Sequence, residues 1–296
     1  MPRVHVHGVD IEYESYGDAA APAILLIAGL ATQMIRWATP FCDSLAAQGF
    51  RVIRFDNRDA GLSTHFSDFP LPEMGALFAA FARGERPAIP YSLGDMAEDA
   101  VALLDALDIG KAHVVGRSMG GMIAQLIAAE HPERVLSLVS IMSTTGNPAL
   151  PQSSPEAMAA MRAPTPDPRQ DEAAFLAHAL TLARVIAGSQ FPFDEDFIRA
   201  QALAEARRSF DPAAAGRQHL AIAVDGDRRA RLRRITAPTL VIHGDEDRLL
   251  PWQAGEDTAA NIEGAVFQKI SGMGHEIPPG LYAEIAERIA AHARAA

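Results

Sequence analysis

Cysteine is almost absent from this sequence. The 296 residues include a single one, Cys42, so an intramolecular disulfide is excluded. A chain without disulfides is typical of a reducing compartment, and we expect the protein to be cytoplasmic. Cys42 lies between Phe41 and Leu45 in a helix expected from about Trp37 to Gln48, which indicates a small core residue rather than a nucleophile.

Positive charge is also scarce. Lysine and arginine number 26 against 37 aspartates and glutamates, and the formal net charge is −11. Nucleic acids and anionic membranes attract a basic face, so neither is expected as a partner. The arginines of residues 228–234 alternate with apolar residues, which indicates salt bridges or a solvated basic segment.

Long apolar stretches are missing as well. No run approaches the ~20 residues that cross a bilayer. Residues 1–7 lack the apolar core of a signal peptide and run straight into strand-like alternation. The sequence therefore predicts neither a membrane span nor secretion, and it leaves the oligomeric state open.

Short apolar runs alternate with helical patterns along most of the chain. This alternation predicts an α/β protein with a mostly parallel central sheet flanked by helices. The expected strands cover residues 4–7, 11–16, 23–27, 51–55, 112–115, 135–141, 238–242 and 266–270.

The composition changes after Thr145. Prolines gather in residues 146–170, and alanine-rich helices are expected over 171–187 and 194–207. We interpret residues 146–233 as a helical cap inserted into a core domain formed by residues 1–145 and 234–296. A second irregular segment, 64–92, is expected to run over the top of the molecule.

The pentapeptide at 116–120, G-R-S-M-G, stands between an expected buried strand and an expected helix. Strand, G-x-S-x-G and helix together form a nucleophile elbow, a turn so tight that only glycine fits close to the serine. This turn exposes the hydroxyl above the sheet, so Ser118 is the predicted nucleophile.

A serine nucleophile needs a base, and the base needs an acid that orients it. His275 lies on a glycine-flanked loop directly after the last expected strand, which favours it as the base. Asp245, Glu246 and Asp247 follow the preceding strand. Asp247 is better placed to reach the imidazole, and Asp245 is the alternative.

An oxyanion hole needs two N–H donors that face the developing negative charge. Met119 N–H, next to the nucleophile, is one expected donor. Gly29 lets the loop after residues 23–27 turn toward the site, and Leu30 N–H is the second expected donor. Gly29, Leu30, Met119 and Trp37 are the expected substrate-binding residues of an apolar cleft beneath the cap.

These motifs resemble those of the α/β-hydrolase superfamily over essentially the whole chain. The matching segments are 28–30, 116–121, 243–251 and 272–275. In such relatives the acid is the aspartate of a G-x-x-D-x-x-x-P pattern, which begins at Gly244 here and favours Asp247. Within the superfamily, segments 54–64, 112–116 and 274–278 are most similar to small-ester hydrolases related to aclacinomycin methylesterase.

The sequence departs from the family pattern at two positions. Ala28 stands where a histidine usually precedes the glycine of the oxyanion loop. Arg117 stands beside the nucleophile, where small or apolar residues are commoner. Two interpretations of Arg117 remain open: a salt bridge to a carboxylate beneath the cap, or a contact with an anionic substrate group.

The resemblance and the motifs predict a serine hydrolase that cleaves carboxylic esters of small molecules through an acyl-serine intermediate. We expect no cofactor and no metal. Lactonases, C–C bond hydrolases and perhydrolases use the same triad and remain alternatives. An alternative of a different class is a ligand receptor that keeps the fold and turns over slowly.

Overall fold

The computed structural model describes residues 2–71, 80, 83–85 and 88–296. The expectation of an irregular segment over 64–92 therefore lies partly outside the described residues. Eight strands form one sheet in the order β1-β2-β4-β3-β5-β6-β7-β8. The strands are β1 (Arg3–Val6), β2 (Val9–Tyr16), β3 (Ala23–Ile27), β4 (Arg51–Phe55), β5 (Ala112–Arg117), β6 (Val135–Ile141), β7 (Thr239–Gly244) and β8 (Val266–Ile270).

Strands β3 to β8 pair in parallel, and β2 alone runs in the opposite direction, pairing antiparallel with β1 on one side and β4 on the other. The central strand β3 is buried along its whole length, as expected for a strand covered on both faces. Its side chains alternate between two apolar clusters: Leu25 and Ile27 face one, and Ile24 and Leu26 face the other.

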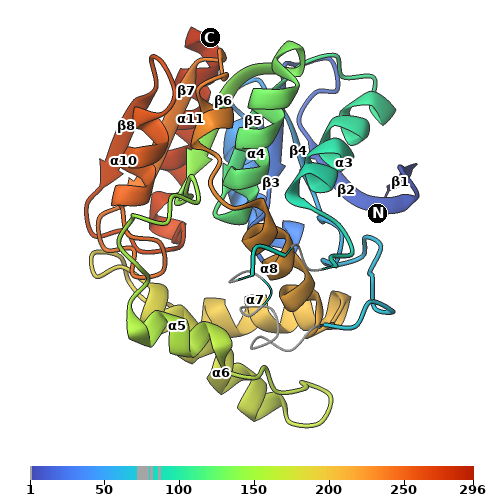
Figure 1. Cartoon of the computed structure of the whole chain (residues 1–296), viewed down its shortest axis with the longest axis vertical. Helices are drawn as coiled ribbons and strands as arrows, with labels where there is room; N and C mark the ends of the chain where they lie inside the picture. The colour runs from blue at the N-terminus through green and yellow to red at the C-terminus, as the bar shows by residue number, and fades with distance from the viewer. Residues whose placement is uncertain (1, 72–79, 81–82, 86–87) are drawn as a thin grey trace.

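Helices cover both faces of the sheet. The helices α3 (Leu93–Ala106) and α4 (Met119–Glu130) pack on one face, in front of the strands in Figure 1. The helices α1 (Thr39–Ala46) and α11 (Tyr282–Ala295) pack on the other face. A further helix, α10 (Gln253–Ala260), packs against β7 and β8.

Five helices lie between β6 and β7. Figure 1 shows the longer ones beyond one end of the sheet, whereas the short last one packs against α4. We call residues 146–233 the insertion. Three of its helices follow N-cap residues whose side chains accept from the first turn: Ser154, Asp171 and Asp194. The helices are α5 (Pro155–Arg162), α6 (Glu172–Ile186), α7 (Glu195–Arg208), α8 (Ala214–Asp225) and α9 (Arg229–Leu232).

Several element boundaries differ from the sequence expectations, and two of these differences have a clear local cause. The first strand ends at Val6 because His7 turns the chain with a φ of 47°. The helix expected from Trp37 begins at Thr39, because Trp37 ends the short 3₁₀ turn Met34–Arg36. Within the described part of the chain, none of the helices has both the length and the apolar character of a membrane span.

Candidate active site

Ser118 occupies the sharp turn between β5 and α4. Its φ of 53° and ψ of −122° lie outside the regions that L residues prefer, so the turn stores strain. A Cβ on Gly116 would lie 2.0 Å from the carbonyl oxygen of Gly120, and one on Gly120 would lie 2.2 Å from that of Ile27. The G-x-S-x-G spacing is therefore a steric requirement of this turn.

The structure brings Ser118, His275 and Asp247 into one hydrogen-bonded chain. The Ser118 Oγ lies 3.0 Å from His275 Nε2. The His275 Nδ1 lies 2.7 Å from Asp247 Oδ2. An ionised carboxylate only accepts hydrogen bonds, so the Nδ1 carries the proton and a neutral Nε2 accepts from the serine hydroxyl.

Asp247 is buried, and its surroundings favour the charged form. Its Oδ1 accepts from the backbone N–H groups of Leu249 and Leu250 at 2.9 and 2.8 Å. Burial opposes ionisation, but the electrostatic interaction with His275 and hydrogen bonds from His243 and His275 hold the pKa of Asp247 well below its usual range. Asp247 is therefore ionised at neutral pH.

His243 is a further hydrogen-bond partner of Asp247, and the sequence analysis did not predict this contact. It is fully buried at the end of β7, and its Nε2 lies 3.1 Å from Asp247 Oδ2 and 2.8 Å from the Leu250 carbonyl oxygen. Both partners accept, so the Nε2–H is shared between them. The only sequence signal was its position at a strand end, four residues before Asp247.

Asp245 has a different partner from Asp247. Its Oδ1 accepts from the backbone N–H of Gly272 at 2.7 Å. This contact ties the loop after β7 to the loop that carries His275. Asp245 thus supports the relative position of the two loops and does not contact the imidazole.

The insertion contacts both of these loops directly. The His275 N–H donates to the carbonyl oxygen of Ile186, the last residue of α6, at 2.7 Å. The approach is so close that a Cβ on Gly274 would lie 2.1 Å from the same oxygen. Ser189 donates to the carboxylate of Glu246 from its N–H at 2.7 Å and from its hydroxyl at 2.6 Å.

The two expected oxyanion donors come from two segments next to Ser118, the start of α4 and the loop after β3. Met119 is the first residue of α4, where backbone N–H groups have no partner in the preceding turn. Gly29 passes so close to Ser118 that a Cβ on Gly29 would lie 3.3 Å from the Ser118 Cβ. Leu30 follows on the same loop, and both Gly29 and Leu30 line the cavity above the serine.

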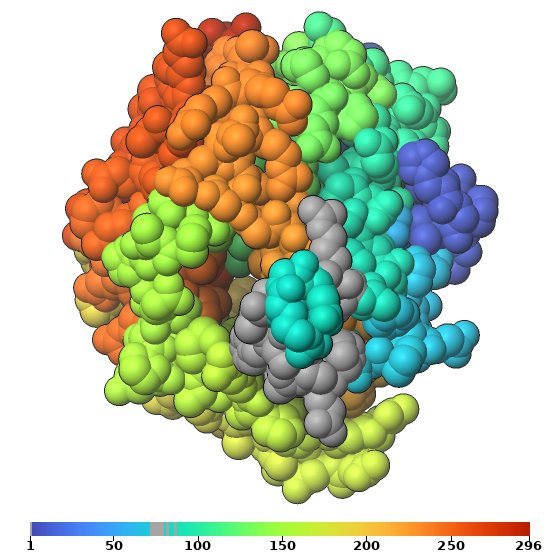
Figure 2. Space-filling model, in the orientation of Figure 1, coloured from blue at the N-terminus to red at the C-terminus, as the bar shows by residue number. Residues whose placement is uncertain are grey.

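A cavity of about 390 Å³ opens above Ser118 and His275. The face of the molecule in Figure 2 is hollowed beside the yellow-green residues of α5. Much of the cavity wall is apolar and comes from the insertion: Met161, Phe175, Leu182, Ile186, Phe193, Phe197, Ile198 and Phe210. Such a wall shields the reacting carbonyl from water, which strengthens hydrogen bonds to a developing charge.

Trp37 does not line this cavity, although the sequence analysis placed it there. Its ring is 1% exposed and stacks on Phe41, with centroids 5.3 Å apart. Trp37 ends the 3₁₀ turn rather than beginning a helix, which directs the indole into the core.

Arg117 covers the Trp37 ring, with its guanidinium 5.1 Å from the centroid. In the part of the chain that the structure describes, this stacking replaces the expected ion pair with a carboxylate. Burial and the neighbouring Arg36 lower the pKa of Arg117 to about 10, against the opposing charges of Glu205, Tyr282 and Glu276. Arg117 also lines the cavity.

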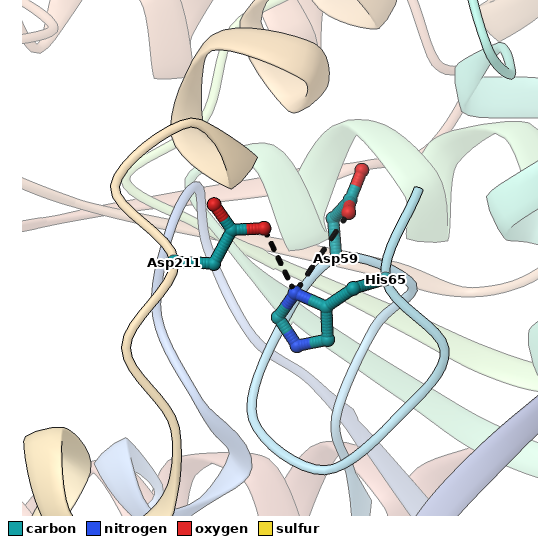
Figure 3. Close-up of side chains that lie close together, drawn as sticks. All are labelled: Asp59, His65 and Asp211. Atoms are coloured by element: carbon teal, nitrogen blue, oxygen red, sulfur yellow. Dashed lines mark hydrogen bonds and ion pairs between the residues drawn. The ribbon is translucent and has the colours of Figure 1, made fainter. Parts of the chain in front are cut away.

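A separate polar cluster joins the insertion to the core. Figure 3 shows His65 between Asp59, on the loop after β4, and Asp211, in the insertion. Their ligand atoms lie within 4.8 Å of one another, close enough for a metal ion. However, Arg217 already donates to Asp59 at 2.8 Å and to Asp211 at 2.5 Å. A guanidinium at this position repels a cation. These residues therefore form an ion-pair network between the core and the insertion rather than a metal site.

The sequence also matches known proteins. Residues 22–278 match the model of the alpha/beta hydrolase fold. Rhodomycin D methylesterase DauP of Streptomyces sp. (strain C5) is 32% identical, over 96% of this chain and 94% of that protein. Rhodomycin D methylesterase DnrP of Streptomyces peucetius is 31% identical over the same shares.

The structure matches solved structures as well. One is the enol-lactonase from Burkholderia xenovorans LB400, with a TM-score of 0.69 over 98% of this chain and 99% of that one. At 21% identity, this likeness concerns the fold alone.

Proposed function

This chain belongs to the α/β hydrolase fold family, and we propose that it hydrolyses carboxylic esters through an acyl-serine intermediate on Ser118. One observation carries the proposal. The hydroxyl of Ser118, the imidazole of His275 and the carboxylate of Asp247 form a continuous hydrogen-bonded chain on the wall of a cavity of about 390 Å³. Such a chain is the apparatus that makes a serine hydroxyl nucleophilic.

In the first half of the reaction, Ser118 Oγ attacks the ester carbonyl while His275 Nε2 takes the hydroxyl proton. The tetrahedral intermediate collapses, and His275 returns this proton to the leaving alkoxide. The products of this half are an alcohol and an acyl-serine. In the second half, His275 takes a proton from water, the hydroxide attacks the acyl carbon, and Ser118 leaves with the proton returned to it.

Two further groups stabilise charge during these steps. The Asp247 carboxylate, held ionised by its partners, stabilises the imidazolium that forms on His275. The backbone N–H groups of Leu30 and Met119 stabilise the negative oxygen of the tetrahedral intermediate. No step of this mechanism uses a cofactor or a metal ion.

The substrate class is a methyl or other short-alcohol ester of a bulky, largely apolar carboxylic acid. The relatives DauP and DnrP are methylesterases. The aromatic wall contributed by the insertion, with Phe175, Phe193, Phe197 and Phe210, provides flat apolar surface for ring-containing acyl groups. This role of residues 146–233 as a cap that selects the substrate is part of the proposal.

The place of action is proposed to be the cytoplasm. The single cysteine, Cys42, is buried and requires no oxidising compartment. The substrate is a small molecule, and the acidic net charge of −11 gives no basis for proposing nucleic acid as a partner.

The test is a comparison of Ser118→Ala with the wild type on methyl esters, p-nitrophenyl esters and lactones. We expect a loss of about 10⁴- to 10⁶-fold in kcat without a change of fold. Ser140→Ala is the matched control, because Ser140 is a buried serine one strand away whose hydroxyl contacts Gln125. Residual ester hydrolysis by Ser118→Ala within tenfold of the wild type would contradict the proposal. A preference of the wild type for lactones over esters would show that the protein is a lactonase.

A further inference from the structure

We propose that Gln218, a residue of the insertion, is a positioning residue of the oxyanion hole, because its side chain takes up the N–H of Ala31 and so leaves the Leu30 N–H for the substrate oxygen. This inference rests on the proposed function. It concerns a residue 100 positions beyond Ser118 in the sequence and on a different part of the fold.

The side chain of Gln218 is a fully buried bridge between two loops of the core. It lies on α8, and its Oε1 accepts from the Ala31 N–H at 2.7 Å. Its Nε2 donates to the carbonyl oxygen of Arg58 at 2.9 Å. One partner can only donate and the other can only accept, so the amide has a single satisfactory orientation.

The Arg58 end of this bridge is held in place by ion pairs. The guanidinium of Arg58 forms two hydrogen bonds of 2.7 Å to the buried carboxylate of Asp99. The neighbour of Gln218, Arg217, binds Asp59 through two further hydrogen bonds of 2.8 Å. Gln218 therefore reaches the oxyanion loop from a fixed position.

The Oε1 end of the Gln218 side chain contacts the oxyanion loop, the loop after β3 that carries Leu30, at a residue with an unfavourable backbone conformation. Ala31 has a φ of 54°, in the left-handed region that residues other than glycine rarely adopt. Core residues hold the two ends of the loop: Asn57 donates to the Ala28 carbonyl at 3.1 Å, and Asp56 accepts from Met34 N–H at 2.7 Å. The insertion also holds Gln33, whose Nε2 donates to the Glu205 carbonyl at 2.9 Å. Gln218 thus supplies the contact in the middle of the loop, one residue from the Leu30 donor.

Two consequences follow for catalysis. Since Ala31 N–H is engaged by Gln218, that donor is not available to a substrate, and the loop presents the peptide of Leu30 instead. Since Gln218 belongs to the insertion, the proposed cap contributes to the chemistry as well as to substrate selection. Small displacements of an oxyanion donor lower the rate of reaction more than they weaken substrate binding.

The experiment replaces the amide by a side chain of similar length that forms no hydrogen bonds. For Gln218→Met we expect kcat on a methyl ester to fall about 10- to 100-fold while KM changes less than about threefold. The affinity for a trifluoromethyl ketone, which forms an oxyanion on Ser118, is expected to fall by the same factor. The affinity for the product carboxylate is expected to stay unchanged.

Gln125→Met is the matched control. Gln125 is also a fully buried glutamine with two side-chain contacts, but these are with Ser140 and Arg228 and not with the loop that carries Leu30. Its replacement is expected to lower the melting temperature without lowering kcat of the folded enzyme. An unchanged kcat in Gln218→Met, or a change in KM alone, overturns the inference.

Gln218→Glu decides the question if the methionine variant does not fold. A protonated carboxyl group has the shape of the amide and can donate to Arg58 while accepting from Ala31, whereas the ionised group cannot donate. The ratio of its kcat to that of the wild type is expected to rise as the pH falls from 8 to about 6, because burial raises the pKa of a carboxyl group. A ratio that does not depend on pH overturns the inference. If the wild type hydrolyses no ester, or Ser118→Ala keeps its activity, the proposed function itself fails.

Discussion

The core and the insertion differ in how much of their surface they bury. In α4, eleven of the twelve residues are buried, whereas only Ala202 is buried among the fourteen residues of α7. The insertion adds charged and polar contacts with the core, such as Arg208 with Asp56 and Arg217 with Asp59, to the apolar contacts made by Ala221 and Leu232. Apolar burial is broadly tolerant of geometry, but ion pairs and hydrogen bonds fix direction. We call these charged and polar contacts between the insertion and the core the polar seam. The polar seam therefore sets the position of the insertion over Ser118.

This comparison makes separate predictions for the two regions. Substitutions at the core site are expected to remove chemistry without unfolding the protein. Substitutions at the seam are expected to affect stability and chemistry together, and those in the apolar wall of the insertion to change only the choice of substrate.

The largest effect is expected from Asp247→Asn. Loss of the carboxylate leaves the Nδ1 of His275 without its acceptor, and comparable changes lower kcat about 10⁴-fold. Asp245→Asn is the matched control on the same loop, because Asp245 contacts Gly272 and not the imidazole. Steady-state kinetics of both variants provide the measurement. If Asp245→Asn proves the more damaging change, the acid is wrongly assigned.

A large loss of stability is expected from Arg217→Met. Two carboxylates, Asp59 and Asp211, lose the buried guanidinium that both contact, and removal of one partner from such a site costs about 3–5 kcal/mol. Arg199→Met is the control in the same insertion, because its exposed pair with Glu195 contributes less than about 0.5 kcal/mol. Urea denaturation measures both. Equal effects of the two substitutions would show that the seam does not hold the insertion.

The core is expected to lose stability in mild acid through His113. This histidine on β5 accepts or donates to Ser137 at 2.9 Å, and burial lowers its pKa from 6.5 to about 4. Between these values the unfolded chain binds a proton that the folded protein does not, so stability falls as the pH drops through this window, by at most about 1.4 kcal/mol per pH unit.

The measurement compares the wild type with His113→Gln, which retains a partner for Ser137 but does not titrate. The difference between their free energies of unfolding is expected to depend on pH between about 6.5 and 4. A difference that is constant over this range would show that His113 is not held neutral.

The smallest effect is expected in the apolar wall. Phe197→Ala, on α7, is expected to lower kcat/KM for a methyl ester of an aromatic acid about tenfold, since an apolar pocket discriminates by ~1–3 kcal/mol. Activity on p-nitrophenyl acetate is expected to change less than about threefold. Leu203→Ala is the control, because Leu203 shares the helix but does not line the cavity. A uniform loss on both substrates would argue against a role of Phe197 in substrate selection.

The sequence predicted those parts of the molecule that local pattern determines. The predictions of an α/β-hydrolase fold and of a carboxylic ester hydrolase are confirmed by the matches to the family and to the two methylesterases. The elbow at Ser118 could be found because its glycines follow from sterics over five residues. The proximity of His275 and Asp247 to Ser118 could be predicted because all three residues follow strand ends, which are local features of the sequence, and their catalytic roles stay predictions.

The contacts between core and insertion could not be predicted in this way. Gln218 and Ala31 lie 187 residues apart, and neither carries a motif. The hydrogen bond from His275 N–H to Ile186 involves only backbone atoms, which leave no trace in residue type. Trp37 was wrongly placed on the cavity wall, because the direction of its side chain depends on a 3₁₀ turn that periodicity does not distinguish from a helix.

The central claim is that Ser118 becomes acylated, and covalent labelling tests it most directly. The wild type is treated with a fluorophosphonate and analysed by intact mass spectrometry and peptide mapping. We predict one equivalent of label, on the peptide that contains Ser118, at a rate that falls sharply in His275→Ala, with no label in Ser118→Ala. Labelling of another residue, or equal labelling of Ser118→Ala, would contradict the account.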